Sequence, residues 1–342
     1  GAASHLGAQQ AFGPGAQRMI AAGSAGLLLA TVLLLARWML RRGLTPPAEV
    51  PSVLPEDAGL VGARSVWIAA PRGRRLFAWY ASAQGCEPSP AVVLLHGWGG
   101  HAGHLLHAAA ALQRAGYAVL LPEARNHGRS DRDDHSSLPR FAEDLGCALD
   151  WLKCQPEVDA ERLAALGHSV GAAAVLLAAS QRDDLRAGVS VSSFAHPEQV
   201  MRRWLAARHI SYWPLGWLVN RYVESVIGTR FARIAPETTL PQTRCPVLLI
   251  HGRSDRTVPL DDVEQLFARR GAASVELLIV EGTHEQFDDE PALFDTVRAF
   301  LHKHLAGAPL AAAHDAGGTA HQPPPLPAAP TPAFDPSSLT LQ

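Results

Sequence analysis

The sequence predicts an α/β fold in which a mainly parallel sheet is covered by helices on both faces. Short apolar segments alternate with helical segments through residues 91–305, and such alternation is typical of parallel strands joined by crossover helices. Residues 91–95 are wholly apolar, as expected for a strand buried on both faces. The third observation is an apolar run at 163–166, followed by Gly-His-Ser-Val-Gly at 167–171 and an alanine-rich helical segment.

The elements follow from the apolar runs and from the turn residues between them. Residues 66–70 and 76–82 read as a hairpin joined by Pro71-Arg72-Gly73-Arg74. The other expected strands are 91–95, 117–121, 163–166, 189–192, 247–250 and 275–280, and the expected helices are 105–114, 138–154, 172–180, 260–270 and 291–305. This core occupies residues 61–305.

Residues 194–243 interrupt the alternation. They contain no strand pattern but carry several aromatic residues, among them Trp204, Trp213 and Trp217. We expect a helical insertion that forms a cap. Its tryptophans can serve packing, can bind substrate in an apolar pocket, or can do both.

The ends of the chain differ in composition from this core. Residues 1–18 are small and polar and carry one charged side chain, and 306–342 are rich in Ala and Pro. Such compositions cannot support a core, so both are expected to be disordered. Residues 41–60, with four prolines, read as a linker.

Residues 19–40 are expected to form one transmembrane helix, because 20–36 is an uncharged apolar run of 17 residues. A cleaved signal peptide would carry its positive charge before the run. Here Arg37, Arg41 and Arg42 follow it and only Arg18 precedes it. By the rule that positive flanks stay inside, this predicts a single-pass membrane protein with a cytoplasmic catalytic domain. A buried core helix is the other alternative.

Charge and cysteine content exclude several classes of protein. The chain has 342 residues, 30 basic and 32 acidic, for a net charge of -2. That balance gives no basic surface for nucleic acid. Its four cysteines are widely spaced and include no Cys-x-x-Cys pair, so neither a zinc site nor a disulfide framework is indicated.

Ser169 is the expected nucleophile. A strand, Gly-x-Ser-x-Gly and a helix in this order are typical of a nucleophile elbow, where a serine stands at the tip of a strained turn. An ordinary structural turn is the alternative interpretation of the five residues.

Two loops at the carboxyl edge of the sheet supply the expected partners. Asp255 lies on the loop after strand 247–250, and His284 follows strand 275–280. In a parallel sheet, functional side chains lie where the strands end at the carboxyl edge. Asp255 is therefore expected to orient His284, and His284 to act as general base. Asp261 and Asp262 compete with Asp255, but they stand where a helix begins and read as capping residues.

When a serine attacks a carbonyl group, the carbonyl oxygen becomes an oxyanion, and two N–H donors are expected to stabilise it. Val170 directly follows the serine at the start of its helix. The second is expected to be Trp98, in the glycine-rich loop after strand 91–95. Near this loop stand His96, His101, His104 and His107, whose spacing would also suit a metal. No carboxylate or cysteine joins them, so we expect no metal site there.

These motifs resemble the α/β-hydrolase superfamily over roughly residues 61–305. The matching runs are 96–100, 167–171, 251–255 and 282–284. Residues 123–130 also resemble the family's Asp-x-Arg-Gly-His-Gly-x-Ser segment, with Glu123 and Asn126 as departures from it. The resemblance implies a serine hydrolase that needs no metal or organic cofactor.

The sequence therefore predicts a membrane-anchored hydrolase of carboxylic esters that acts on small molecules, with lipid-like esters among the candidate substrates. One rival is a serine aminopeptidase, which needs a cap carboxylate to hold the substrate amine, and Glu198, Glu224 and Glu237 are available. The other rival is a non-catalytic binding scaffold, which has no need of Ser169, Asp255 and His284 together.

Overall fold

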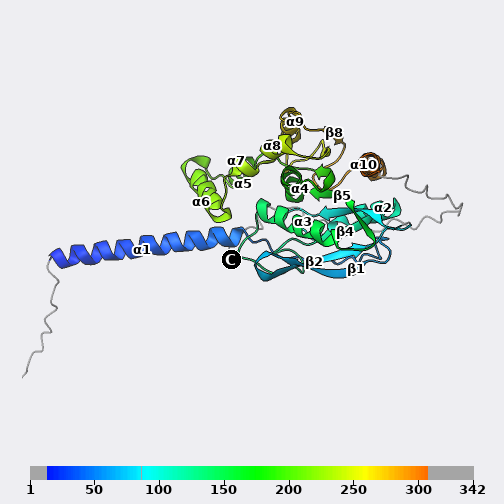
Figure 1. Cartoon of the computed structure of the whole chain (residues 1–342). Coiled ribbons are helices and arrows are strands. Elements are labelled where there is room, and N and C mark those ends of the chain that lie inside the picture. Colours follow the sequence, from blue (N-terminus) through cyan, green and yellow to red (C-terminus); the bar gives the residue numbers. More distant parts are fainter. Residues whose placement is uncertain (1–13, 86, 307–342) are drawn as a thin grey trace, which may run out of the picture.

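An eight-stranded sheet forms the centre of the protein in the computed structural model, which describes residues 14–85 and 87–306 (Figure 1). The strand order is β1-β2-β4-β3-β5-β6-β7-β8. The strands are β1 (Arg64–Ala70), β2 (Arg74–Ala81), β3 (Ser89–Leu95), β4 (Ala118–Pro122), β5 (Val158–His168), β6 (Leu185–Val191), β7 (Val247–Gly252) and β8 (Val275–Val280). Only β1–β2 and β2–β4 pair antiparallel, and the other pairs are parallel. The predicted mainly parallel sheet is confirmed.

Helices cover both faces of this sheet. Helices α3 (Leu138–Lys153) and α4 (Val170–Gln181) pack on one face, and α9 (Leu260–Ala268) lies beyond them over β7. Helices α2 (Leu106–Arg114), preceded by the short η2 (Ala102–Leu105), and α10 (Glu290–Leu305) pack on the other face. Two apolar layers therefore enclose the parallel strands.

The strands and the helix at the centre are buried as their sequences predict. All seven residues of β3 are buried, which agrees with its uninterrupted apolar pattern. Residues 171–179 of α4 are also all buried, because this alanine-rich helix is apolar all round and can lie in the core. The turn between β5 and α4, which carries Ser169, is therefore supported by closely packed elements.

Between β6 and β7 the chain forms a succession of helices that corresponds to the expected cap. These are α5 (Pro197–Ala207), η3 (Tyr212–Gly216), α6 (Trp217–Ile227), α7 (Phe231–Ile234), α8 (Pro236–Thr239) and η4 (Leu240–Gln242). Figure 1 shows α5 and α6 standing out from the body, with α6 near the end of the N-terminal helix α1.

The long helix α1 (Pro14–Gly43) contains the residues 19–40 that the sequence analysis assigned to a membrane span. In the described ranges, no helix combines the length and the apolar character needed to cross a membrane. The predicted transmembrane helix is therefore not supported. Of the two predicted disordered tails, residues 14–18 lie in α1, while 1–13 and 307–342 lie outside the described residues, as does Cys86. The remaining cysteines, Cys147, Cys154 and Cys245, are free thiols.

Candidate active site

Ser169 occupies a strained turn between β5 and α4. Its backbone has φ 53° and ψ -115°, a conformation that residues other than glycine rarely adopt. The Ser169 N–H donates to the Val191 carbonyl at 2.9 Å, which ties the turn to the neighbouring strand β6. A strained serine at the end of a central strand has the geometry of a nucleophile elbow.

The two glycines of the motif are required by close backbone packing. A Cβ at Gly167 would lie 2.2 Å from the Gly171 carbonyl oxygen, and a Cβ at Gly171 would lie 2.3 Å from the Leu95 oxygen. Neither contact can be relieved by moving a flexible side chain. The Gly-x-Ser-x-Gly spacing is therefore dictated by the turn itself.

The predicted base and its orienting acid are in direct contact. Nδ1 of His284 lies 2.7 Å from Oδ2 of Asp255, and both side chains are buried. The other carboxylate oxygen accepts the amides of Thr257 and Val258 at 2.9 and 2.8 Å. An ionised carboxylate only accepts, so Nδ1 of His284 carries the proton and Nε2 keeps its lone pair for proton transfer.

The two competing carboxylates, Asp261 and Asp262, have structural roles. Asp262 accepts the Ala195 amide at 2.8 Å and pairs with Arg203 at 2.7 Å, so it joins the start of the cap to α9. Asp261 is exposed in the first turn of α9, where an acidic side chain complements the helix N-terminus.

His168, inside the elbow motif, also contacts the base. Its Nε2 lies 2.8 Å from the backbone oxygen of His284, and the two rings are 4.8 Å apart. Ser192 Oγ donates to the same oxygen at 3.4 Å. The residue before the nucleophile therefore fixes the loop that carries the base. This role is not predicted by the sequence pattern, although the position of His168 beside Ser169 is a signal for it.

The loop after β3 passes directly against the nucleophile. A Cβ at Gly97 would lie 3.1 Å from the Ser169 Cβ, and the next residue is Trp98. Within the described ranges, no hydrogen bond uses the amide of Trp98 or of Val170. Val170 is also the first residue of α4, whose N-terminus favours negative charge. Both predicted oxyanion donors are thus free to bind a ligand.

His96 holds this loop in place and is not free to bind a metal. Nδ1 of His96 contacts the Gly97 oxygen at 2.7 Å, and Nε2 accepts the Ala124 amide at 3.1 Å. Burial lowers the pKa of His96 well below its usual value, so the ring stays neutral. His101 accepts the Gly103 amide at 3.1 Å and caps η2, and its ring lies 4.1 Å from that of His104.

The segment after β4 is held by a buried arginine. Arg125 forms ion pairs with Asp144 at 2.6 Å, with Asp133 at 3.3 Å and with Glu143. Beside it, His127 is fully buried and donates from Nδ1 to the Arg125 oxygen at 2.9 Å. In the sequence, this segment is marked only by its resemblance to a family motif.

A metal ion would find one candidate group in the described part of the chain. A ligand atom from each of His168, His284 and Glu285 lies within 4.8 Å of the others. One of these residues is the predicted base His284, so a metal bound there would occupy the predicted base.

The three cap tryptophans lie apart from this arrangement. Trp204 is partly buried and stacks under Arg208 at 3.9 Å, whereas Trp213 and Trp217 are exposed and contact each other. Among the described residues, no hydrogen bond or ring contact joins any of them to Ser169, Asp255 or His284. Their role in binding substrate stays a prediction.

Similarity to known proteins agrees with this geometry. Residues 86–230 match the family model Hydrolase_4, the serine aminopeptidase S33 family. The uncharacterized protein Rv2307c of Mycobacterium tuberculosis is 31% identical over 259 residues, which cover 75% of this chain and 83% of that protein. Protein ABHD12B of Homo sapiens is 27% identical over 241 residues, 66% of this chain and 64% of that protein.

Among solved structures, the esterase Pf2001 of Pyrococcus furiosus has the same fold. It superposes with a TM-score of 0.62 at 23% sequence identity, and the match covers 76% of this chain and 99% of that chain. The fold, the elbow and the relatives point to one conclusion: this chain belongs to the α/β-hydrolase superfamily.

Proposed function

We propose that the protein hydrolyses carboxylic esters through an acyl-enzyme intermediate on Ser169. Membership of the superfamily gives hydrolysis as the reaction class, and the observation that carries the proposal is the 2.7 Å contact between His284 and Asp255. A hydrogen bond further ties the loop of His284 to the elbow. A serine becomes an effective nucleophile when an oriented base takes its proton.

In the proposed reaction each of these groups has one role. Ser169 Oγ attacks the ester carbonyl while Nε2 of His284 takes the hydroxyl proton, and Asp255 stabilises the resulting imidazolium. The amides of Trp98 and Val170 bind the oxyanion, and each such donor typically contributes about 3 kcal/mol to transition-state stabilisation. His284 returns the proton to the leaving alcohol, and a water molecule attacks the acyl-enzyme by the same route in reverse.

The aminopeptidase alternative needs a free cap carboxylate to bind the substrate amine, and this requirement separates it from an esterase. Each candidate already has an arginine partner. Glu198 accepts from Arg202 and from the Tyr212 hydroxyl, both at 2.7 Å, and Glu237 pairs with Arg269 at 3.2 Å.

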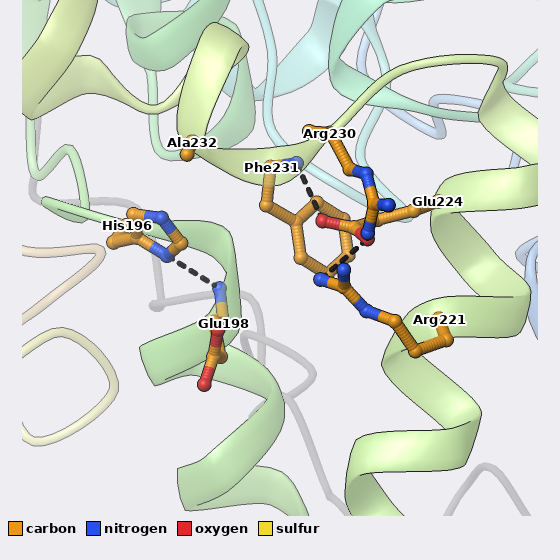
Figure 2. Close-up of a pocket in the computed structure, with 7 residues that line it drawn as sticks. All are labelled: His196, Glu198, Arg221, Glu224, Arg230, Phe231 and Ala232. Carbon is orange, nitrogen blue, oxygen red and sulfur yellow. Dashed lines mark hydrogen bonds and ion pairs between the residues drawn. The ribbon is translucent and has the colours of Figure 1, made fainter.

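The third candidate, Glu224, is the most completely neutralised. It pairs with Arg221 at 2.5 Å and Arg230 at 3.1 Å, and it accepts the Phe231 amide at 2.9 Å. Figure 2 shows these groups around a cavity of about 270 Å³ between α5, α6 and the start of α7. Each of the three candidate cap glutamates is thus already paired with an arginine. None of the three is left as an unpaired carboxylate for a substrate ammonium group, which supports an ester over an N-terminal amine as the substrate.

A substrate panel tests this proposal. Purified protein is assayed with p-nitrophenyl esters of increasing acyl length and with aminoacyl p-nitroanilides, and Ser169→Ala serves as the blank. Turnover of the esters alone is expected, with the preferred chain length reporting the size of the pocket. Turnover of the anilides at a comparable kcat/KM would establish the peptidase. Failure on both series, together with no covalent labelling of Ser169, would establish the non-catalytic scaffold.

A further inference from the structure

Large apolar side chains are exposed at the tip of the cap. Trp213 is 66% exposed, Leu218 53% and Trp217 40%. The two indole rings lie 5.5 Å apart, so they form one apolar group. Single exposed apolar residues need no explanation, but contiguous ones mark an interaction surface.

The same side of the molecule carries a second exposed apolar group, on α1. Leu34, Leu35 and Trp38 are each more than half exposed. The Tyr222 hydroxyl on α6 donates to the Arg37 oxygen on α1 at 3.5 Å. Figure 1 shows α6 next to this end of α1. Leu218 is four residues before Tyr222 and therefore lies on the same face of α6, which places it beside α1. The contact between α6 and α1 therefore brings the two groups to the same side of the molecule.

Positive charge borders this combined surface. Arg37, Arg41 and Arg42 are exposed, and none of them pairs with an acidic side chain in the described part of the chain. The Arg42 guanidinium lies 5.5 Å from the centre of the Trp38 ring. Exposed indoles beside unpaired arginines match the chemistry of a lipid headgroup region, where tryptophan is enriched and cations meet anionic phosphates.

We infer that Leu34, Leu35, Trp38, Trp213, Trp217 and Leu218, the cap–α1 surface, bind an anionic lipid bilayer. The apolar side chains enter the headgroup region and the arginines contact the anionic lipids. A second copy of the chain fits less well, because a symmetric contact through this surface would bring two arginine clusters onto one interface. The inference does not depend on the proposed ester hydrolysis, since it concerns binding alone.

Sedimentation with vesicles tests it. The full chain is mixed with vesicles of phosphatidylcholine or of phosphatidylcholine with phosphatidylglycerol, and the bound fraction is measured. The wild type is expected to bind the anionic vesicles more tightly. The double variant Trp213→Ala/Trp217→Ala, and separately Arg41→Glu/Arg42→Glu, should each weaken that binding about tenfold or more. Trp67→Ala is the matched control, because Trp67 is 46% exposed on β1, away from the cap.

Three results would overturn the inference. Equal binding to both vesicle types would show that the arginines do not contact anionic lipid. Unchanged binding of the tryptophan double variant would show that the cap does not contact the bilayer. A dimer in light scattering that the same tryptophan substitutions dissociate would assign the surface to a second copy of the chain. Circular dichroism of each variant confirms that loss of binding is not loss of folding.

Discussion

His168 and His284 are joined by a hydrogen bond between the Nε2 of the first and the backbone oxygen of the second, 2.8 Å long. The bond links the turn of the nucleophile to the loop of the base, although the two residues are 116 positions apart in the chain. Burial lowers the pKa of His168, so its ring is neutral and its single N–H is committed to this bond. The relative position of Ser169 and His284 thus depends on a neutral side chain.

Removing this bond should slow the reaction without abolishing it. We expect His168→Ala to lower kcat by about 10- to 100-fold with little change in KM, because a displaced base costs the transition state more than substrate binding. His168→Gln, which keeps an N–H donor, should recover part of the loss. The measurement is steady-state ester hydrolysis, with His107→Ala, an exposed histidine on α2, as the control. A larger effect on Tm than on kcat, with no recovery by Gln, would reduce His168 to a packing residue.

Asp255→Asn should lower kcat by about 10⁴ while the protein folds normally. The amide cannot replace the carboxylate that accepts from Nδ1 of His284, so the imidazolium loses its stabilising charge. Asp261→Asn is the matched control on the neighbouring helix α9, and its rate should equal that of the wild type. If the two variants had equal activity, Asp255 would have no part in orienting the base.

Burial of His127 should make stability depend on pH in a defined direction. Burial lowers the pKa of His127 to about 4 from an ordinary value of 6.5, so between these values the unfolded chain binds the proton more readily. The contribution of His127 to the free energy of unfolding is fully present above about pH 6.5, and it decreases as the pH falls toward 4. A shift of this size removes about 2 kcal/mol between pH 7 and pH 5.

A difference measurement isolates this effect from the opposite one of Asp144, whose pKa burial raises to about 6. We expect the urea-unfolding free energy of the wild type to fall relative to that of His127→Gln as the pH decreases from 7 to 5. Parallel curves for the two proteins would show that the His127 pKa is not lowered.

The sequence was sufficient for the parts of the fold that local pattern determines. Residues 91–95 and 247–250 were placed on strands because their apolar runs are uninterrupted, and the elbow was found because its glycines follow from backbone packing. The first part of β5, residues 158–162, was missed because its charged residues break the apolar pattern. The strand order could not be read, since pairing between distant segments leaves no local signature.

Side-chain contacts between distant segments likewise could not be predicted from the sequence. Asp255 and His284 could be placed on adjacent loops by the rule that parallel strands end at one edge. The contacts of His168 with His284 and of His96 with Ala124 depend on loop geometry. The pairing of each cap glutamate with an arginine depends on how the cap helices pack.

The central claim, that Ser169 is a nucleophile activated by His284 and Asp255, is tested most directly by covalent labelling. The full chain is treated with a fluorophosphonate, and the modified residue is located by mass spectrometry. We expect one adduct, on Ser169, with no adduct in Ser169→Ala and wild-type labelling in the control Ser254→Ala. Labelling that persists in Ser169→Ala, or that maps to Ser130 or Ser254 in the wild type, would contradict the account.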